Sequence, residues 1–350
     1  MRKNRFHVGK NTVRRAAFAM GMLLACTQLG GCQGKTLPEK KNAIRIGVSL
    51  YRADDTFIGN IRSEMEKRAK AYEQETGIRV TLDIQDAKGN QYTQNKQVER
   101  FISLGCDALC VNPVDRTTSS GIIDPAMAAD IPVVFFNRQP VEEDLDRWDK
   151  LYYVGADAKE SAVLEAEIVA DQYEKDPVSL DKNGDGVISY VLLEGENNHQ
   201  DSLIRTEWSV QTLKDRGVPI EKITGGIANW ERSQASALME QWLSAYPDTI
   251  ELVISNNDDM ALGAIDALER AGGRKISVVG IDGTTQGQDA VRNGKMLGTV
   301  SSDKTGYANA IFTIAAAAGL GEPIPPEIDL EDRKYYWTRQ NNVVKEKINP

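Results

Sequence analysis

Short runs rich in β-branched residues alternate with longer amphipathic stretches along almost the whole chain. The runs that we expect to form strands are residues 44–50, 78–84, 107–111, 132–136, 152–154, 187–193, 250–255, 276–281 and 297–300. Between them, stretches such as 57–75, 90–104, 161–173 and 258–271 repeat their apolar residues at the helical period. Because each helix carries the chain back to start the next strand in the same direction, this order predicts parallel α/β sheets.

The length of the chain favours more than one core. It has 350 residues, of which 41% are apolar and 27% charged, which is an ordinary globular composition. Single hydrophobic cores stop growing at about 250–300 residues. We therefore expect two α/β lobes.

The chain is acidic overall but basic at its start. Lys and Arg total 42 against 51 Asp and Glu, a formal net charge of −9. The first 31 residues contain no acid, and 36 basic and 51 acidic residues remain beyond them. Nucleic-acid-binding domains usually carry the opposite charge, so we expect no nucleic-acid partner.

The basic start leads into an apolar run from Ala16 to Ala25. This run is too short for a bilayer-spanning helix, which needs about 20 residues, and is typical of an export signal. Leu29-Gly30-Gly31-Cys32 then resembles the lipobox of bacterial lipoproteins. We predict a lipoprotein signal peptide over residues 1–31, lipidation of Cys32 and a polar tether over residues 32–42. Cys26 is a second candidate for the lipid, and a retained membrane anchor is the alternative.

Two further cysteines, Cys106 and Cys110, lie in one strand-like run. Four strand residues span about 13 Å, whereas the Cα atoms of a disulfide lie within about 7 Å. We therefore expect both to be buried free thiols.

The residues needed for common hydrolytic chemistry are largely missing. There is no Gly-x-Ser-x-Gly motif, and of the two histidines His7 lies in the signal region, which leaves His199 alone. A His-rich metal site is excluded on this count. We expect a protein that is not an enzyme; the alternative is a secreted carbohydrate-active enzyme that uses paired carboxylates such as Asp55 and Asp282.

One segment has the spacing of a calcium-binding loop of the EF-hand type. Oxygen donors occupy loop positions 1, 3, 5 and 9, glycine occupies position 6, and position 7 offers its carbonyl. Position 12 is Leu192 in a strand-like run, so another acid must complete the shell. We predict a structural Ca²⁺ site, the alternative being a polar turn that binds nothing. The loop residues are Asp181, Asn183, Asp185, Gly186, Val187 and Ser189.

Polar residues recur just after the carboxyl ends of the expected strands, where open α/β sheets bind their ligands. Carboxylates, amides and guanidinium groups at such positions suit a neutral polyol, whose hydroxyls both donate and accept. Phe57 and Trp230 could cover the apolar face of a sugar ring. Taken singly, each polar residue could instead cap a helix, and each aromatic could belong to the core. The polar set is Tyr51, Asp55, Asn137, His199, Asp201, Arg205, Asn257, Asp282 and Ser302.

From residue 43 to residue 350 the chain resembles the galactose/glucose-binding proteins of bacterial ABC sugar uptake and chemotaxis. The resemblance rests on residues 46–57, 132–137 and 152–155, the calcium loop, and residues 191–201 and 254–263. It implies a type I periplasmic-binding-protein fold, in which two doubly wound parallel-sheet lobes joined by three hinge crossings bind one hexopyranose. The lobes would be residues 43–156 with 303–333 and residues 157–302 with 334–350. The crossings would lie near Ala156, Ser302 and Arg333.

The resemblance also implies roles for individual residues. Tyr51 would lie in the cleft, Asp55 would receive the sugar 4-hydroxyl, and Phe57 and Trp230 would sandwich the ring. Glu251 would complete the calcium shell. The other polar residues named above would bind the remaining sugar oxygens. Two departures from the family pattern are Ser302 in place of asparagine and Ser189 in place of glutamine.

These expectations combine into one functional hypothesis. The chain would be an exported, lipid-anchored, monomeric binding protein in the periplasm or on the outer face of the cell membrane. It would deliver D-galactose or D-glucose to an ABC permease, with a chemoreceptor as a further candidate partner. The alternatives are a binding protein of the same fold for a pentose, ribose or an autoinducer, and a sugar-responsive repressor. The export signal and the lack of a helix-turn-helix segment before Ala43 disfavour the repressor.

Overall fold

Two six-stranded sheets organise residues 41–345, the part of the chain that the computed structural model describes. The first contains β1 (Ala43–Leu50), β2 (Arg79–Asp86), β3 (Ala108–Val111), β4 (Val133–Phe136), β5 (Leu151–Ala156) and β11 (Tyr335–Thr338). The second contains β6 (Ile188–Glu194), β7 (Ile220–Ile227), β8 (Leu252–Ser255), β9 (Ser277–Asp282), β10 (Gly298–Ser302) and β12 (Gln340–Val344). The strand orders are β11-β5-β4-β3-β1-β2 and β12-β10-β9-β8-β6-β7.

The two sheets repeat one topology. In each, the first strand lies between the second and the third, so the chain winds first towards one edge and then towards the other. Neighbouring strands are parallel except β10 and β12, which are antiparallel. The predicted pair of doubly wound α/β lobes is confirmed.

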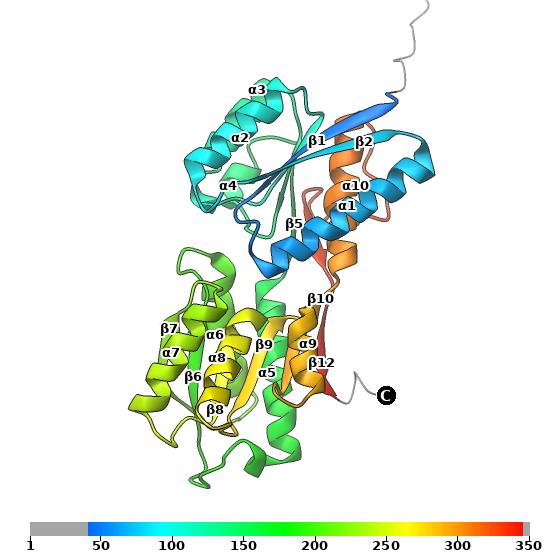
Figure 1. Cartoon of the computed structure of the whole chain (residues 1–350). Coiled ribbons are helices and arrows are strands. Elements are labelled where there is room, and N and C mark those ends of the chain that lie inside the picture. The colour runs from blue at the N-terminus through cyan, green and yellow to red at the C-terminus, as the bar shows by residue number, and fades with distance from the viewer. Residues whose placement is uncertain (1–40, 346–350) are drawn as a thin grey trace, which may run out of the picture. The chain divides into compact units, whose positions relative to one another are not determined.

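Helices cover both faces of each sheet (Figure 1). The first lobe carries α1 (Thr56–Thr76), α2 (Gln91–Ser103), α3 (Ser120–Ala128), α4 (Glu142–Leu145) and α10 (Lys304–Leu320). The second carries α5 (Ala158–Lys175), α6 (Gln200–Asp215), α7 (Arg232–Ala245), α8 (Asp258–Arg270) and α9 (Thr285–Arg292). One apolar cluster fills each interface between a sheet face and its helices. The central strands are therefore buried on both faces, which explains their continuous apolar sequences.

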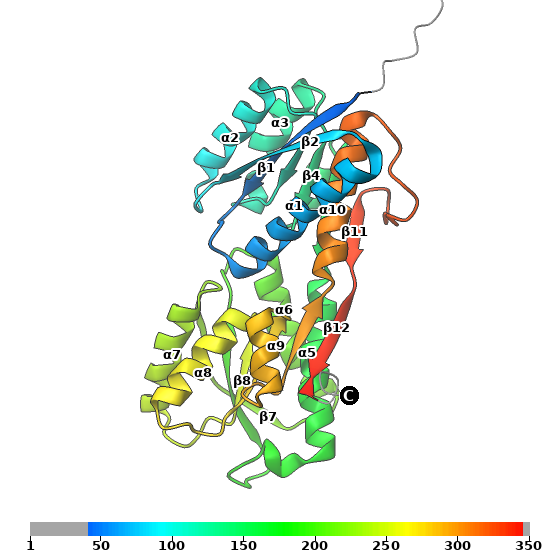
Figure 2. The same cartoon turned by 45° about the vertical axis from the view of Figure 1, so that its right-hand side comes forward.

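Three segments cross between the lobes: β5 to α5, β10 to α10, and β11 to β12. Strands β11 and β12 follow one another in Figure 2. The amide of Asp303 donates to the carbonyl of Arg339 over 3.0 Å. Gln340 Nε2 donates to the carbonyl of Asp157 over 2.8 Å. These bonds tie the three crossings to one another.

The predicted third crossing near Arg333, and with it the start of the last segment at residue 334, is wrong. Residues Tyr335–Thr338 form β11, which pairs with β5 and so belongs to the first lobe. The ring of Tyr335 packs edge-on against that of Tyr153, with 6.3 Å between centroids, and favours this placement. The crossing therefore lies at Arg339, between β11 and β12.

Strands β7, β11 and β12 were not predicted from the sequence. Strand β7 mixes charged residues with the pair Gly225–Gly226 and lies at an edge of its sheet, which weakens the apolar pattern. Cys106 and Cys110 are buried free thiols, as predicted. Within residues 41–345, no helix is both long and apolar enough to cross a bilayer. The predicted signal peptide, Cys26, Cys32 and nearly all of the tether lie outside the described residues.

Candidate functional site

A cavity of about 370 Å³ is lined by residues that follow the carboxyl ends of strands in both sheets. This is the end at which doubly wound sheets bind ligands, beside the switch in strand order. The structure brings together every predicted ligand-binding residue except Ser302. The lining consists of Tyr51, Asp55, Phe57, Ile58, Asn137, Arg138, His199, Asp201, Arg205, Trp230, Asn257 and Asp282.

From the first lobe, Tyr51 and Asp55 reach the cavity together. Tyr51 directly follows β1, and Asp55 caps α1 by accepting a hydrogen bond from the amide of Ile58 over 2.9 Å. The phenol of Tyr51 donates to the other carboxylate oxygen of Asp55. Burial raises the pKa of Asp55. Because both oxygens are engaged, the Asp55 carboxylate is held in one orientation.

Arg138 lines the cavity but was not predicted. Its side chain is buried, with the guanidinium carbon 3.7 Å from the ring centroid of Tyr51. Its Nη1 donates to the carbonyl of Val114 over 3.1 Å. Arg138 directly follows Asn137 at the end of β4, which is the one signal in the sequence that could have identified it.

In the second lobe, His199 caps α6, because its Nδ1 accepts a hydrogen bond from the amide of Asp201 over 3.1 Å. Burial and the nearby Arg138 and Arg205 hold the pKa of His199 well below its usual range, so the ring is neutral. With Nδ1 as acceptor, the remaining proton is on Nε2, which can donate to a ligand.

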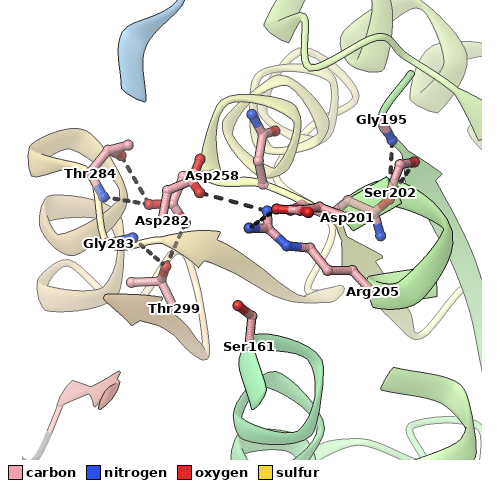
Figure 3. Close-up of polar contacts among 12 residues, drawn as sticks. Ser161, Gly195, Asp201, Ser202, Arg205, Asp258, Asp282, Gly283, Thr284 and Thr299 are labelled. Carbon is pink, nitrogen blue, oxygen red and sulfur yellow. Dashed lines mark hydrogen bonds and ion pairs between the residues drawn. The ribbon is translucent and has the colours of Figure 1, made fainter. Parts of the chain in front are cut away.

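Arg205 connects the two carboxylates of the second lobe (Figure 3). Its Nη2 lies 3.4 Å from Oδ2 of Asp201, and its Nη1 lies 3.8 Å from Oδ1 of Asp282. Nη1 also donates to the carbonyl of Asn256 over 2.9 Å. Burial raises the pKa of Asp201 above its usual range and holds that of Asp282 well above its usual range. Both contacts with the carboxylates are long, which leaves their oxygens able to accept hydrogen bonds from a ligand.

A third buried aspartate of the second lobe, Asp258, anchors the loop that carries Asp282 (Figure 3). Its carboxylate accepts from the amide of Thr284 over 2.7 Å and from the hydroxyl of Thr299 over 2.6 Å. Asp282 itself has a φ of 111°, a strained value for a residue with a side chain. Such strain persists where surrounding contacts enforce it and is common in ligand sites.

Asn257 precedes Asp258 and caps α8. Its Oδ1 accepts a hydrogen bond from the amide of Met260 over 3.0 Å. The amide nitrogen of Asn257 is thereby left as the group available to a ligand. The alternative interpretation of these polar residues as helix caps is therefore correct for Asp55, His199 and Asn257, which cap helices while lining the cavity.

The two aromatic residues come from different lobes. Phe57 lies in the first turn of α1 and packs edge-on against Tyr307, with 5.9 Å between ring centroids. Trp230 lies between β7 and α7, has a φ of 65°, and packs edge-on against His199 at 5.1 Å. Both rings are only partly buried, so each retains surface for a ligand.

Ser302 is not part of the cavity lining. It is the last residue of β10, is paired with Gln340 of β12, and lies at a crossing between the lobes. Its side chain is one of the shortest polar side chains. The structure thus places Ser302 in the hinge.

Two ion pairs join the lobes beside the cavity. Arg138 Nη1 lies 2.9 Å from Oε2 of Glu196, and Arg52 pairs with Glu231. The arginines belong to the first lobe and the glutamates to the second. Such pairs favour the conformation in which the lobes are in contact.

Comparison with known proteins places this geometry in a family. The model for the periplasmic binding protein domain matches residues 46–323. The chain belongs to the periplasmic binding protein family. Together with the two lobes described above, this membership confirms the predicted type I periplasmic-binding-protein fold.

The relatives of this periplasmic binding protein differ in their named ligands. A D-galactose/methyl-galactoside binding periplasmic protein of Haemophilus influenzae is 35% identical over 83% of this chain and 86% of its own length. A ribose import binding protein of Bacillus subtilis is 27% identical over 75% and 77%. A solved solute binding protein of a Bacillus halodurans ABC transporter, with bound myo-inositol, is 30% identical, with a TM-score of 0.73 over 89% of this chain and 98% of its own.

The predicted calcium loop of this periplasmic binding protein leads into β6, and its last predicted ligand, Ser189, is the second residue of that strand. Gly184 and Gly186 have φ values of 74° and 86°, which the tight turn requires. Glu251 is buried and accepts from the amides of Lys182, Asn183 and Ser189 over 2.7, 3.0 and 2.9 Å. Glu251 directly precedes β8 and is the residue that the resemblance assigns to the calcium shell. It thus lies directly against the loop.

The carboxylate, amide, hydroxyl and carbonyl oxygens of the loop are of the kinds that bind a hard cation such as Ca²⁺. Within residues 41–345 no group of three or more His, Cys, Asp or Glu side chains is gathered to hold a metal ion. The carboxylates of Asp181 and Asp185 instead accept hydrogen bonds from amides of the loop. Each such oxygen has a second lone pair, so these bonds do not prevent it from also binding a cation.

Proposed function

We propose that this periplasmic binding protein captures D-galactose or D-glucose and delivers it to the membrane subunits of an ABC sugar permease. The observation that carries the proposal is the cavity, in which carboxylates, amides, a neutral imidazole and two guanidinium groups converge from both lobes. The 35% identity to a galactoside-binding protein supports the choice of hexose. In this role the protein binds and releases its ligand and catalyses no reaction.

The donors and acceptors of the site match sugar hydroxyls. His199 Nε2 and the amide of Asn257 donate, whereas Asp201 and Asp282 accept, and each hydroxyl can do both. Asp55 would receive the 4-hydroxyl in either epimer, which would admit both galactose and glucose. Phe57 and Trp230 would cover the two apolar faces of the ring, and Asn137 and Arg205 would bind the remaining oxygens.

Ligand binding would be coupled to the hinge. A sugar in contact with residues of both lobes stabilises the conformation in which they meet, and an empty site leaves the lobes free to part. Micromolar affinity requires about −8 kcal/mol. A few charge-assisted hydrogen bonds of about 1.5–3 kcal/mol each, with ring stacking, can supply this after the costs of association.

The identity of the ligand is testable with a panel of sugars in calorimetry. We expect micromolar or tighter binding of D-galactose or D-glucose, and binding of ribose, arabinose and myo-inositol at least about tenfold weaker. The pentoses lack the hydroxymethyl group and leave site groups unpaired, and myo-inositol has a ring carbon with a hydroxyl where a hexopyranose has its ring oxygen. Chemical conversion of the sugar during incubation would instead favour the carbohydrate-active enzyme. Equal or tighter binding of ribose or myo-inositol would favour the alternative ligands that the more distant relatives bind.

We further propose that the loop before β6 holds a structural Ca²⁺. Asp181, Asn183, Asp185 and Ser189 would supply side-chain oxygens, Val187 its carbonyl, and Glu251 the carboxylate that position 12 lacks. The ion would join the loop to the start of β8 and stabilise the second lobe.

Removal of Ca²⁺ is expected to lower the melting temperature by several degrees, since a ligand bound only by the native state stabilises it by about 2.7 kcal/mol at 100 times its dissociation constant. Differential scanning calorimetry with and without EDTA measures this shift, and added Ca²⁺ should reverse it. In Glu251→Gln the shift should be much smaller. Identical melting curves of the wild type in EDTA and in Ca²⁺ would contradict the proposal.

Export and anchoring belong to the same proposal. A lipid at Cys32 would tether the monomer beside its permease, in the periplasm or on the outer face of the cell membrane, and a chemoreceptor could also receive the loaded form. Mass spectrometry of the mature N-terminus tests the anchor and distinguishes Cys32 from Cys26.

A further inference from the structure

One nitrogen of the central site arginine lacks a partner. The Nε of Arg205 is buried and makes no hydrogen bond to the described residues, although Nη1 and Nη2 are bonded. An unmet buried donor is unfavourable, because the hydrogen bond it made to water in the unfolded chain is not replaced. The guanidinium group of Arg205, at the centre of the binding site, is therefore held through Nη1 and Nη2 but not through Nε.

A buried carboxyl on the adjacent helix has a matching unpaired atom. Glu165 of α5 is fully buried, and its Oε1 has no partner among the described residues, whereas its Oε2 accepts a hydrogen bond from the hydroxyl of Ser209 over 2.6 Å. Ser209 follows Arg205 by one turn of α6, so both side chains leave the helix on the face that meets α5. Ser161, one turn before Glu165, points from α5 towards Arg205 in Figure 3.

We propose that Glu165 is a positioning residue for Arg205, and that loss of its proton draws the guanidinium towards α5 and weakens hexose binding. The inference rests on the proposed function. When Glu165 is protonated, it carries no charge to attract Arg205, and the guanidinium interacts with Asp201, Asp282 and the ligand. With an ionised Glu165, a third carboxylate competes for the same guanidinium at its unpaired Nε.

The charges around Glu165 give the direction of the pH dependence. Burial raises the pKa of Glu165 to about 8, against the opposing effects of the Ser209 hydrogen bond, of Arg205 and of the backbone amide of Ser255. Glu165 therefore holds its proton at neutral pH and loses it in mildly alkaline solution. The other charged groups facing it are Asp258 at the start of α8 and, beyond Arg205, Asp282 at the end of β9. The remaining strands against α5, β10 and β12, contain no charged residue.

Two neighbouring groups, Asp258 and His199, have pKa values below the mildly alkaline range in which Glu165 loses its proton. Burial raises the pKa of Asp258 only to about 6, and that of His199 lies well below 6.5. Burial also raises the pKa of Asp282 well above its usual range. A change in hexose affinity between about pH 7 and about pH 9.5 is therefore assigned to Glu165 by its disappearance in a Glu165 variant.

The experiment compares hexose affinity across this range in the wild type, Glu165→Gln and Glu167→Gln. Glutamine at position 165 keeps the shape and the acceptor for Ser209 but cannot ionise. We expect wild-type affinity to fall at least about fivefold as the pH rises, and the Glu165→Gln profile to stay within about twofold. Glu167→Gln, a partly exposed glutamate of the same helix, should follow the wild type.

A second measurement needs no variant. Calorimetry near pH 8 in two buffers of different ionisation enthalpy should show proton uptake by the wild type on hexose binding, because the bound form favours protonated Glu165. The absence of proton uptake, or parallel pH profiles for the wild type and Glu165→Gln, would overturn the inference. Failure of the wild type to bind any hexose at pH 7 would instead overturn the proposed function.

Discussion

Replacing Asp282 with alanine is expected to weaken hexose binding at least about tenfold, a loss of about 1.4 kcal/mol or more. Asp282 is buried at the end of β9 and lies 3.8 Å from Arg205. Its removal deletes a ligand acceptor and leaves Arg205 with one carboxylate fewer. The strained φ of 111° indicates that the loop, anchored by Asp258, presents this side chain at an energetic cost. Titration calorimetry with D-galactose and D-glucose measures the effect.

Matched variants separate this effect from a general loss of charge or stability. Asp289→Ala removes an aspartate from the exposed surface of α9, where it pairs with Arg292, and should leave hexose affinity unchanged. Asp282→Asn keeps the side-chain shape but removes the charge and one acceptor oxygen, so it should also bind hexose more weakly. Asp201→Ala should resemble Asp282→Ala, because Asp201 is the other carboxylate beside Arg205. Wild-type affinity in a folded Asp282→Ala protein would refute the assignment of this cavity to the sugar.

The layers of the fold could be predicted because they depend on local patterns. Runs such as Val133–Phe136 are buried on both faces, and their continuous apolar sequence identifies them as central strands. Strand β11 could not be recognised in the same way, since Tyr335 and Tyr336 remain partly exposed and the strand joins a sheet formed much earlier in the chain. The position of the third crossing depended on that long-range pairing and was therefore misplaced.

The candidate site shows the same division between local and long-range information. Residues such as Asn257 and Asp282 directly follow apolar strands, and the carboxyl ends of parallel strands share one edge, so their convergence follows from position. Arg138 has no local signal of burial. Its role depends on the ring of Tyr51 and on Glu196 of the other lobe. Ser302 has the right position at a strand end, but it is the residue at which the chain crosses to the first lobe.

Gly195→Ala is expected to weaken hexose binding at least about tenfold by displacing Trp230, although Gly195 itself is not among the residues that line the cavity. A Cβ at position 195 would lie 2.2 Å from both Cζ2 and Cη2 of the indole. These are atoms of a rigid ring, which must move as a whole. Trp230 would then lose its packing on His199 and its place in the cavity wall. Calorimetry measures the affinity, and tryptophan fluorescence reports the displacement.

A matched glycine supplies the control for Gly195→Ala. Gly59 lies within α1, and a Cβ added there would meet no other side chain or loop atom within 4 Å. Gly59→Ala should therefore retain hexose affinity and raise the free energy of unfolding by up to about 1 kcal/mol. A double-mutant cycle then identifies the cause. If Gly195→Ala acts only through the indole, it should cost almost no further affinity in a Trp230→Ala background, and the two losses should not add. Additive losses would show that Gly195 is required for something other than the position of Trp230.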